Sequence, residues 1–396
     1  MITVAQKNRV IKTMLKIVED ERQNLIACNQ KELKAFAGGD TAMYDRLKVD
    51  DAKVDEMKKS LQDVWEKPDP IGQLISTYDH PNGMMVQNKT APFGTILIIY
   101  ESRPDVTVEA AAIAFKSGNK ILLKGGKESK ESNLLLVGCW HRALLQSNLT
   151  PDWVQYLDFN RTKTQAFLKS PTCKLDLIVP RGGEGLIHFV KEHATCPVLV
   201  SGRGNNFLYV HRDADWDMAE KIILNAKLSK ISACNALDKV LIDEALPSFT
   251  DRVVSLFQKM ENSDVEVLSN IDTHKRAKAT VWTSDDVLYE EFLEHKILVT
   301  ASSNMLDAVT MINEYAGGHS ATIVTDSAEV ADEFMDSVDS AAVYCNASTR
   351  FTDGGQMGMG AELAISTDKL HHRGPLGLEQ LVTNKWYIYG NGQIRE

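Results

Sequence analysis

The sequence lacks the features that would direct it to a membrane or to nucleic acid. Its 396 residues carry 44 Lys plus Arg against 54 Asp plus Glu, a formal net charge of −10, which disfavours nucleic acid and anionic membranes as partners. The longest apolar stretches, TILIIY and AAAIAF, are far shorter than a membrane span. The N-terminus has no continuous apolar segment like that of a signal peptide. We therefore expect a cytoplasmic protein.

Closely spaced cysteines are also missing. The six cysteines are Cys28, Cys139, Cys173, Cys196, Cys234 and Cys345. None forms a CxxC pair or a zinc-ligand spacing, so we expect no metal site. In a reducing compartment they are free thiols, and most free cysteines are small buried hydrophobic residues. A catalytic role for any one of them needs a specific reason.

No complete nucleotide-binding motif is present either. GRGNNF, from Gly202, supplies only the first two glycines of GxGxxG, and there is no Walker A motif. Lys124-Gly125-Gly126 ends a predicted strand, where a lysine can reach a ribose or phosphate and the backbone can approach it closely. PRGGEG, residues 180–185, follows a strand in the same way. A plain turn between a strand and a helix explains both glycine groups as well.

What the sequence does contain is a regular alternation of strands and helices. Two amphipathic helices are predicted before residue 67, and ISTYDHPNGMMVQ is typical of a hairpin that turns at Asn82-Gly83. The predicted strands that follow are GTILIIY, KILLKGG, WVQYLDF, LDLIVPRGG, PVLVSGRG and NNFLYV, and then KVLI, VEVLS, KILVTA, ATIVT and AAVYCNAS. Helix-sized segments separate them, which predicts an α/β fold with mostly parallel sheets.

Two α/β blocks therefore meet near residues 229–235, and Cys234 lies at this junction. Ligand crevices of α/β proteins lie at the carboxyl ends of strands and between domains, which favours a functional role for Cys234. Near the C-terminus, NASTRFTDGGQMGMGAE places polar residues and Arg350 directly after a strand. This pattern suits an anionic ligand, although a glycine-rich loop can also be a mobile connection. His319, after two glycines, is interpreted as structural.

Several stretches together resemble the gamma-glutamyl phosphate reductases of the aldehyde dehydrogenase superfamily. They are YESRPDVTVEAAAIAFKSGNKILLKGGKE, LDLIVPRGG, ACNAL, GGHSATIVT, VDSAAVYCNASTRFTDGG, GMGAELAISTDKLHHRGPLGLEQL and YGNGQIR, in order over nearly the whole chain. The resemblance implies a Rossmann-like NADP-binding domain (residues 1–72 and 92–228), an α/β catalytic domain with a nucleophilic cysteine (229–375) and a small oligomerisation element (73–91 and 376–396). A homo-oligomer is therefore expected.

The reaction that the resemblance implies is the second step of proline biosynthesis. NADPH reduces L-glutamyl 5-phosphate to L-glutamate 5-semialdehyde, and phosphate is released through a thioester on Cys234. The implied catalytic residues are Cys234, Asn235 and Ser102, with the Cys234 N–H and the Ser102 side chain stabilising oxyanions. The implied cofactor-binding residues are Lys124, Gly125, Gly126, Arg181, Gly182, Gly183 and Glu291. The implied substrate-binding residues are Arg103, Asn346, Ser348, Thr349 and Arg350.

Several alternatives stay open. Arg103 and Arg350 are expected to bind the phosphate and the carboxylate of the substrate, without an assignment of which binds which, and association with a glutamate 5-kinase is left open. An NAD-dependent hydrolytic aldehyde dehydrogenase would need a glutamate as general base, and the alignment puts Val200 there. A catalytically silent scaffold subunit would be expected to lack the cysteine or the arginines. Two segments differ from the sequence that is usual in the family, namely SKISACNA and VLVSGRGNNFLYV.

Overall fold

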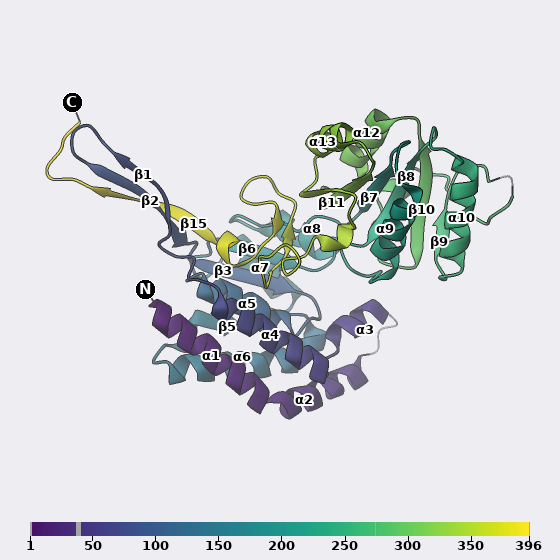
Figure 1. The fold of residues 1–396 in the computed structure, drawn as a ribbon. Coiled ribbons are helices and arrows are strands. Elements are labelled where there is room, and N and C mark those ends of the chain that lie inside the picture. The colour runs from purple at the N-terminus through teal and green to yellow at the C-terminus, as the bar shows by residue number, and fades with distance from the viewer. Residues whose placement is uncertain (1, 37–40, 274, 396) are drawn as a thin grey trace. The chain divides into compact units, whose positions relative to one another are not determined.

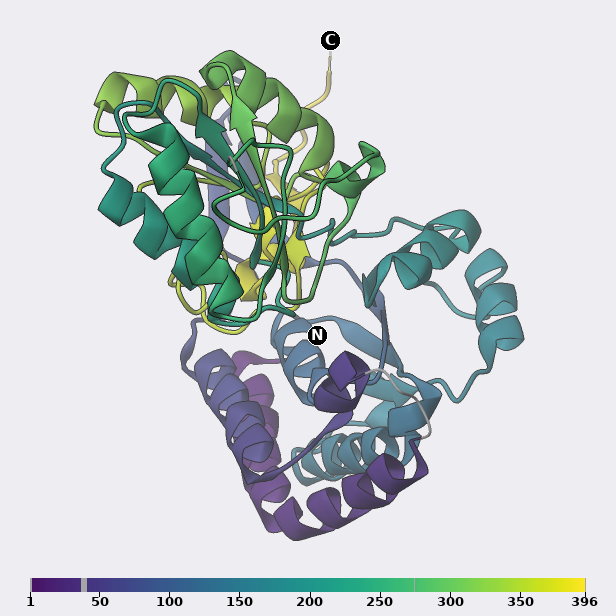
Figure 2. The same ribbon diagram turned by 90° about the vertical axis from the view of Figure 1, so that its right-hand side faces the viewer.

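The computed structural model describes residues 2–36, 41–273 and 275–395, and the chain divides into two compact units (Figure 1). The first unit comprises the chain up to Val200 with 358–364 and 376–396, and the second comprises 201–357 and 365–375. Each unit has its own parallel sheet with helices packed against it (Figures 1 and 2). Within the described residues, no helix combines the length and the apolar character that a membrane span requires.

The first unit begins with four helices where the sequence pattern predicted two. They are α1 (Val4–Asp20), α2 (Arg22–Ala35), α3 (Thr41–Leu47) and α4 (Asp51–Glu66). The predicted apolar stripes belong to α1 and α4, whose Met14 and Met57 are fully buried. Helix α2 lacks a clear apolar stripe, because only Leu25 and Asn29 are buried. The spacing of apolar residues therefore did not predict it. The Asp50 side chain starts α4 by accepting the Lys53 N–H at 3.0 Å.

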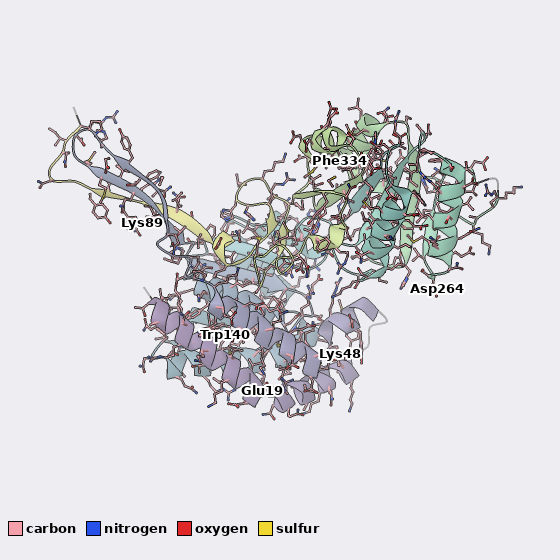
Figure 3. The ribbon with its side chains drawn as sticks, viewed as in Figure 1. Glu19, Lys48, Lys89, Trp140, Asp264 and Phe334 are labelled. Atoms are coloured by element: carbon pink, nitrogen blue, oxygen red, sulfur yellow. The ribbon has the colours of Figure 1, made fainter. Side chains whose placement is uncertain are left out.

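The parallel sheet of the first unit has the strand order β5-β4-β3-β6. Its strands are β3 (Thr95–Tyr100), β4 (Lys120–Lys124), β5 (Val154–Tyr156) and β6 (Leu177–Arg181). Its helices are α5 (Val106–Lys116), α6 (Lys130–Gln146), α7 (Arg161–Lys169) and α8 (Glu184–His193). Trp140 of α6 (Figure 3) is fully buried, and its indole N–H donates to the Thr107 carbonyl at 3.1 Å. The alternation predicted from the sequence is confirmed here.

The segment PVLVSGRG was predicted as a strand, and this prediction is wrong. Only one bridge joins it to the sheet, between Ile178 and Val198, with the Leu199 N–H donating to the Ile178 carbonyl at 2.9 Å. Pro197 has no N–H to give to a ladder, and the glycines at 202 and 204 provide no side chains to pack on a pleated surface. The segment instead leads into the second unit.

A separate antiparallel sheet combines the predicted hairpin with the C-terminal strand. Its order is β1 (Leu74–Asp79), β2 (Met85–Pro92) and β15 (Val382–Tyr389). The hairpin turns at Gly83, whose φ of +89° favours glycine. Several large apolar side chains of this sheet are exposed, namely Leu74, Ile75, Tyr78, Trp386, Ile388 and Tyr389.

The second unit contains a six-stranded parallel sheet of order β12-β11-β7-β8-β10-β9. The strands are β7 (Asn206–Val210), β8 (Leu237–Asp243), β9 (Glu266–Leu268), β10 (Lys296–Ser302), β11 (Ser320–Val324) and β12 (Ala342–Cys345). The helices are α9 (Trp216–Leu228), α10 (Phe249–Glu261), α11 (Asp286–Tyr289), α12 (Met305–Tyr315) and α13 (Ala328–Ser337). Phe334 (Figure 3) stacks on Tyr209 in this core, with ring centroids 6.2 Å apart.

The division between the units differs from the predicted boundary at residue 228. Strand β7 pairs with β8 and β11, so residues 201–228 contribute β7 and α9 to the unit that carries Cys234. Near the C-terminus, residues 358–364 belong to the first unit, and 365–375 form the short pair β13 (Ile365–Ser366) and β14 (Gly374–Pro375) of the second. Strand pairing between distant segments decides these boundaries.

Candidate functional site

Cys234 lies in the loop between α9 and β8, and its backbone is fixed from behind. The Cys234 carbonyl accepts a hydrogen bond from Asn206 Nδ2 at 2.8 Å, and the same buried amide contacts the Gly204 carbonyl at 2.8 Å and the Ala236 carbonyl at 2.6 Å. A Cβ at residue 204 would lie 1.9 Å from the Cys234 carbonyl oxygen, so only glycine permits this approach. Cys234 itself is exposed, which makes it accessible to a substrate.

Asn235 ties the cysteine loop to the turn that carries Arg350. Its Nδ2 donates to the carbonyls of Arg350 at 3.2 Å and Thr352 at 2.9 Å, and its own carbonyl accepts from Thr349 Oγ1 at 2.8 Å. Both amide hydrogens of Asn235 are therefore engaged with main-chain carbonyls. This arrangement holds the 349–352 turn, a short 3₁₀ helix at Thr349–Phe351, against the cysteine loop.

Arg350 lines a pocket beside this loop. The pocket has a volume of about 310 Å³, and its lining residues are Asn225, Ser229, Arg350, Phe351, Asp353 and Gln356. Arg350 Nε donates to Ser229 Oγ at 3.0 Å, whereas its Nη1 is buried without a hydrogen-bond partner in the part of the chain described. Burial lowers the pKa of the Arg350 guanidinium, and the negative charges of Cys234 and Asp353 oppose this effect.

Two other predicted substrate residues are engaged in local structure. The Asn346 side chain accepts the Thr325 N–H at 3.0 Å and donates to the Thr325 carbonyl at 2.9 Å, which stabilises its left-handed backbone at φ +54°. Ser348 caps the 3₁₀ helix by accepting the Arg350 N–H at 3.3 Å. Of the predicted polar group after β12, Arg350 alone lines the pocket.

His319 starts a buried chain of hydrogen bonds that reaches the same turn. Its Nδ1 is 2.8 Å from Ser320 Oγ, which is 2.7 Å from Thr352 Oγ1, and that hydroxyl is 2.8 Å from the Tyr344 hydroxyl. Burial lowers the pKa of His319 to about 4, so the ring is neutral near pH 7. The geometry agrees with a structural role for this residue.

The segment that carries Glu291 is held by the buried side chains of Asn205, which precedes β7, and of two residues of β8. Asn205 Nδ2 donates to the Leu288 carbonyl at 2.6 Å, and Lys239 Nζ donates to the Glu290 carbonyl at 2.7 Å. The Phe292 N–H donates to Asp238 Oδ2 at 2.9 Å. Hydrogen bonds to the Glu290 carbonyl and from the Phe292 N–H therefore hold the backbone on both sides of Glu291.

Two lysines that contact this segment or its partners are fully buried. Lys239 is fully buried, donates to Asn205 Oδ1 at 2.9 Å and lies 3.6 Å from the centroid of the Phe292 ring. Burial lowers its pKa to about 7. Lys227 is also fully buried and pairs with Asp238 Oδ1 at 3.1 Å, and burial lowers its pKa too. The sequence analysis did not identify this network. The charged residues Asp238 and Lys239 within the otherwise apolar strand LDKVLI could have indicated it.

In the first unit, Ser102 and the glycine turn after β4 lie together. Ser102 is 2% exposed, and its hydroxyl donates to Glu128 Oε2 at 3.3 Å. A Cβ at Gly126 would lie 3.2 Å from the Ser102 nitrogen. Lys124 Nζ donates to the Gly125 carbonyl at 2.9 Å, and burial lowers the pKa of this half-buried amine. Strands β3 and β4 are parallel neighbours, so their ends bring these residues to one edge of the sheet.

The predicted turn after β6 is filled by Glu101, a residue that sequence reasoning missed. Glu101 Oε2 accepts the Gly183 N–H at 3.0 Å, and a Cβ at Gly182 would lie 2.5 Å from the Glu101 carboxyl carbon. Gly183 precedes the first turn of α8. Arg181 pairs with Tyr100 in the sheet and accepts the Glu101 N–H at 3.1 Å through its carbonyl.

Arg103 follows Ser102 and lies within electrostatic reach of Glu109 on α5. Burial and the nearby Asp105 raise the pKa of Glu109 to about 8, and Arg103 opposes this shift. Asp105 in turn lies 3.7 Å from Lys53 Nζ. The edge that carries Ser102 therefore holds both cationic and acidic side chains.

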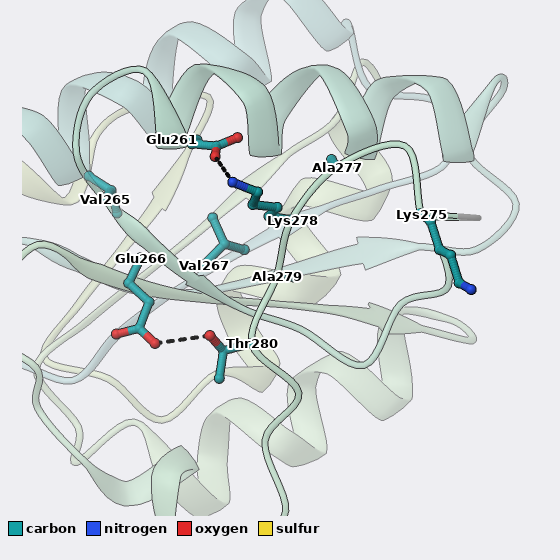
Figure 4. A pocket seen from close by; sticks show the side chains of 9 residues that line it. All are labelled: Glu261, Val265, Glu266, Val267, Lys275, Ala277, Lys278, Ala279 and Thr280. Atoms are coloured by element: carbon teal, nitrogen blue, oxygen red, sulfur yellow. Dashed lines mark hydrogen bonds and ion pairs between the residues drawn. The ribbon is translucent and has the colours of Figure 1, made fainter.

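A larger open pocket of about 560 Å³ lies elsewhere in the second unit (Figure 4). It lies between α10 and the 275–280 loop, beside β9. Two of its side-chain pairs are in contact: Lys278 Nζ is 3.4 Å from Glu261 Oε1, and Thr280 Oγ1 donates to Glu266 Oε1 at 3.1 Å. None of the predicted site residues lines it.

Comparisons with known proteins agree over the length of the chain. The model of the aldehyde dehydrogenase family matches residues 1–275. A gamma-glutamyl phosphate reductase of Dictyoglomus thermophilum is 37% identical, covering 100% of this chain and 95% of the relative, and one of Clostridium beijerinckii is 39% identical, covering 98% and 94%. The crystal structure of the Thermotoga maritima gamma-glutamyl phosphate reductase superposes with a TM-score of 0.94 at 35% identity, covering 100% of this chain and 95% of that one.

Proposed function

The chain belongs to the gamma-glutamyl phosphate reductases of the aldehyde dehydrogenase family, and from this premise we propose that it reduces L-glutamyl 5-phosphate to L-glutamate 5-semialdehyde with release of phosphate. The observation that carries the proposal is an exposed Cys234 on a rigidly held loop beside an arginine pocket. A nicotinamide cofactor follows from the family, and we propose that it is NADPH.

In the proposed mechanism, the Cys234 thiolate attacks the acyl carbon, and the bond from this carbon to the phosphate oxygen breaks. The products of this step are a thioester and free phosphate. NADPH, when bound, supplies the hydride that reduces the thioester carbonyl. The resulting thiohemiacetal takes up a proton on oxygen during reduction and loses it as the carbon–sulfur bond breaks, giving the aldehyde and regenerating the thiolate. A thiolate suits both steps because it is a good nucleophile and a good leaving group.

Each step places negative charge on the substrate oxygen. We assign its stabilisation to the Cys234 N–H and to the Ser102 hydroxyl, whose single hydrogen must turn from Glu128 to the substrate oxygen. The loop contacts made by Asn206 and Asn235 support the first assignment, because they fix the backbone around the cysteine. For Asn235 we propose a positioning role, since both of its amide hydrogens are used. Thr349, Ser348 and Asn346 position the Arg350 turn in the same way.

The glycine turn after β4 fits a cofactor ribose or phosphate. A Cβ at Gly125 would collide with Asn133, and a Cβ at Gly126 would crowd Ser102, so glycine is favoured at both positions. Lys124 places an amine at the end of the strand. We propose that Lys124, Gly125, Gly126, Arg181, Gly182 and Gly183 bind the adenosine and phosphate portion of NADP, and that Glu291 binds the nicotinamide ribose. The fastened backbone on both sides of Glu291 supports this role.

We also propose that the chain acts as a homo-oligomer through the sheet β1-β2-β15. Tyr78 and Ile388 both pair with Val86 and so lie on one face of the sheet with Trp386, and these exposed side chains form an apolar surface of a kind that marks protein interfaces.

The experiment that tests the function is the reverse reaction, followed as NADP reduction with L-glutamate 5-semialdehyde. Phosphate should be required and arsenate should replace it, because Val200 stands where a hydrolytic enzyme needs its base and water lacks a proton acceptor. Val200→Glu is expected to open a slow phosphate-independent route. Multiple turnovers at full rate in phosphate-free buffer, with free glutamate as product, would instead indicate a hydrolytic aldehyde dehydrogenase.

A further inference from the structure

The pocket beside Cys234 contains two opposite charges that do not neutralise each other. Arg350 and Asp353 both line it and lie within electrostatic reach of one another. Within the described residues they nevertheless form no ion pair: Arg350 Nε binds Ser229, and Asp353 Oδ1 accepts the Gln356 N–H at 3.1 Å. A cation and an anion held apart in one pocket match a ligand that itself carries both charges.

We propose that this pocket binds the α-amino acid group of the substrate, with Arg350 on the α-carboxylate and Asp353 on the α-ammonium group. The proposal rests on the proposed function and resolves which of the two arginines meets the carboxylate. The phosphate is then left to Arg103.

The state of the Arg350 guanidinium supports the carboxylate assignment. Its Nε contact with Ser229 fixes the plane of the group, and its Nη1 is buried without a hydrogen-bond partner. A buried donor of a charged group that lacks a partner is costly, and a carboxylate accepts such donors in a planar, charge-assisted geometry. The Thr349 and Asn235 contacts hold the arginine's backbone, so the donor is in place before the ligand arrives.

Asp353 supplies the complementary group. Its Oδ1 is held by the Gln356 N–H, and the Met357 N–H donates to its carbonyl at 2.9 Å, which fixes the residue on its turn. Its Oδ2 has no hydrogen-bond partner in the part of the chain described. A phosphate dianion here would be repelled by this carboxylate, whereas an ammonium group would be attracted. The pair thus favours a zwitterion over a phosphate.

The position of Cys234 agrees with this orientation. In a glutamyl substrate, two methylene groups separate the α-carbon from the reacting carbon. Cys234 lies within electrostatic reach of Arg350 and on the loop to which the Arg350 turn is bonded. A substrate anchored by its α-amino acid group therefore extends its acyl carbon toward the sulfur. The pocket selects α-amino acid derivatives and disfavours simple dicarboxylic semialdehydes.

The test compares two aldehydes in the NADP reduction assay: L-glutamate 5-semialdehyde and 5-oxopentanoate, which lacks the amino group. Asp353→Asn keeps the acceptor for the Gln356 N–H and removes the charge. It should raise KM for the first aldehyde about tenfold or more, as expected for a lost charged hydrogen bond, and leave KM for the second within about twofold. Arg350→Gln should raise KM for both aldehydes, and neither variant should change KM for phosphate. Asp336→Asn on the exposed face of α13 is the matched control.

A second measurement needs no turnover. L-Glutamate should slow alkylation of Cys234 by iodoacetamide in the wild type, followed by peptide mapping, and glutarate should protect far less. Asp353→Asn should abolish the difference between them. Equal protection by both acids in the wild type, equal effects of Asp353→Asn on both aldehydes, or a raised KM for phosphate in Arg350→Gln would each overturn the proposal. Because alkylation does not depend on catalysis, the protection result stays separate from failure of the reductase assignment.

Discussion

Replacing the buried Lys239 with Met should change how the stability of the protein depends on pH. In the wild type, burial lowers the pKa of the Lys239 amine from 10.5 to about 7, while Asp238 opposes the shift. The unfolded chain, with its ordinary lysine pKa, binds a proton between these values that the folded chain does not. The free energy of unfolding of the wild type should therefore rise with pH above 7, relative to the variant, by up to about 1.4 kcal/mol per pH unit.

A second effect of Lys239→Met does not depend on pH. The Glu290 carbonyl and Asn205 Oδ1 lose their donor, and leaving the buried Asn205 acceptor without a partner costs about 1–3 kcal/mol. Below pH 7 both folded and unfolded lysines are protonated, so the difference between wild type and variant should be constant there. The expected difference curve is thus flat up to about pH 7 and then increases in favour of the wild type.

Urea unfolding at pH 6, 7, 8 and 9, followed by tryptophan fluorescence, measures this curve. Lys296→Met is the control, because its amine lies 5.0 Å from the centroid of the same Phe292 ring but its side chain is 20% exposed and lies 3.5 Å from Glu294 Oε1. The charge of Lys296 contributes to the lowered pKa of Lys239, so this variant keeps the buried amine and should differ from the wild type with a far smaller pH dependence than Lys239→Met. A wild-type advantage over Lys239→Met that stays constant or shrinks from pH 7 to pH 9 would refute the argument that burial controls this lysine.

Three further outcomes are expected. Cys234→Ala should abolish reduction while leaving folding and NADP binding intact, and Cys173→Ser, the other exposed cysteine, should stay active; activity in the first variant would remove the nucleophile assignment. Lys124→Ala should weaken NADP more than NAD by about 1–3 kcal/mol, measured by fluorescence titration, and equal losses for both would contradict a contact with the 2′-phosphate. Asn206→Ala should lower kcat, because the Cys234 and Ala236 carbonyls of the cysteine loop and the Gly204 carbonyl lose their donor, with little change in the Kd for NADP; an unchanged kcat would show that the loop needs no such support.

Local patterns predicted much of the fold. The alternation of strands and helices from β3 onward and the Asn82-Gly83 hairpin follow from short-range periodicity and turn chemistry. The position of the unit boundary did not, because it depends on β7 pairing with β8 and β11. The false strand at PVLVSGRG shows the same limit, since an apolar run that makes a single bridge to its neighbour does not become a strand.

The sequence could nominate candidate site residues where a residue type suggests the chemistry, as for Cys234 and Arg350, whose roles stay predictions. It could not nominate residues that act by supporting others. Asn205 directly precedes β7, and Asn206 is its first residue. Although they are neighbours in the chain, Asn205 holds the segment before Glu291 and Asn206 holds the cysteine loop. The partners of Lys239 lie far along the chain, and no local pattern relates Lys239 to Glu290. Only the folded arrangement of the sheet brings them together.

The way in which the chain is divided between the two units determines what a single proteolytic cut can release. The backbone passes from one unit to the other at 200–201, 357–358, 364–365 and 375–376, so neither unit is a continuous stretch of polypeptide. A protease that cleaves once after Val200 would release no free domain, because the downstream fragment still owns β15, which is paired along its length with β2 of the upstream fragment. Genes encoding the two fragments separately should therefore give a complementing pair, in which recovered activity reports on reassociation.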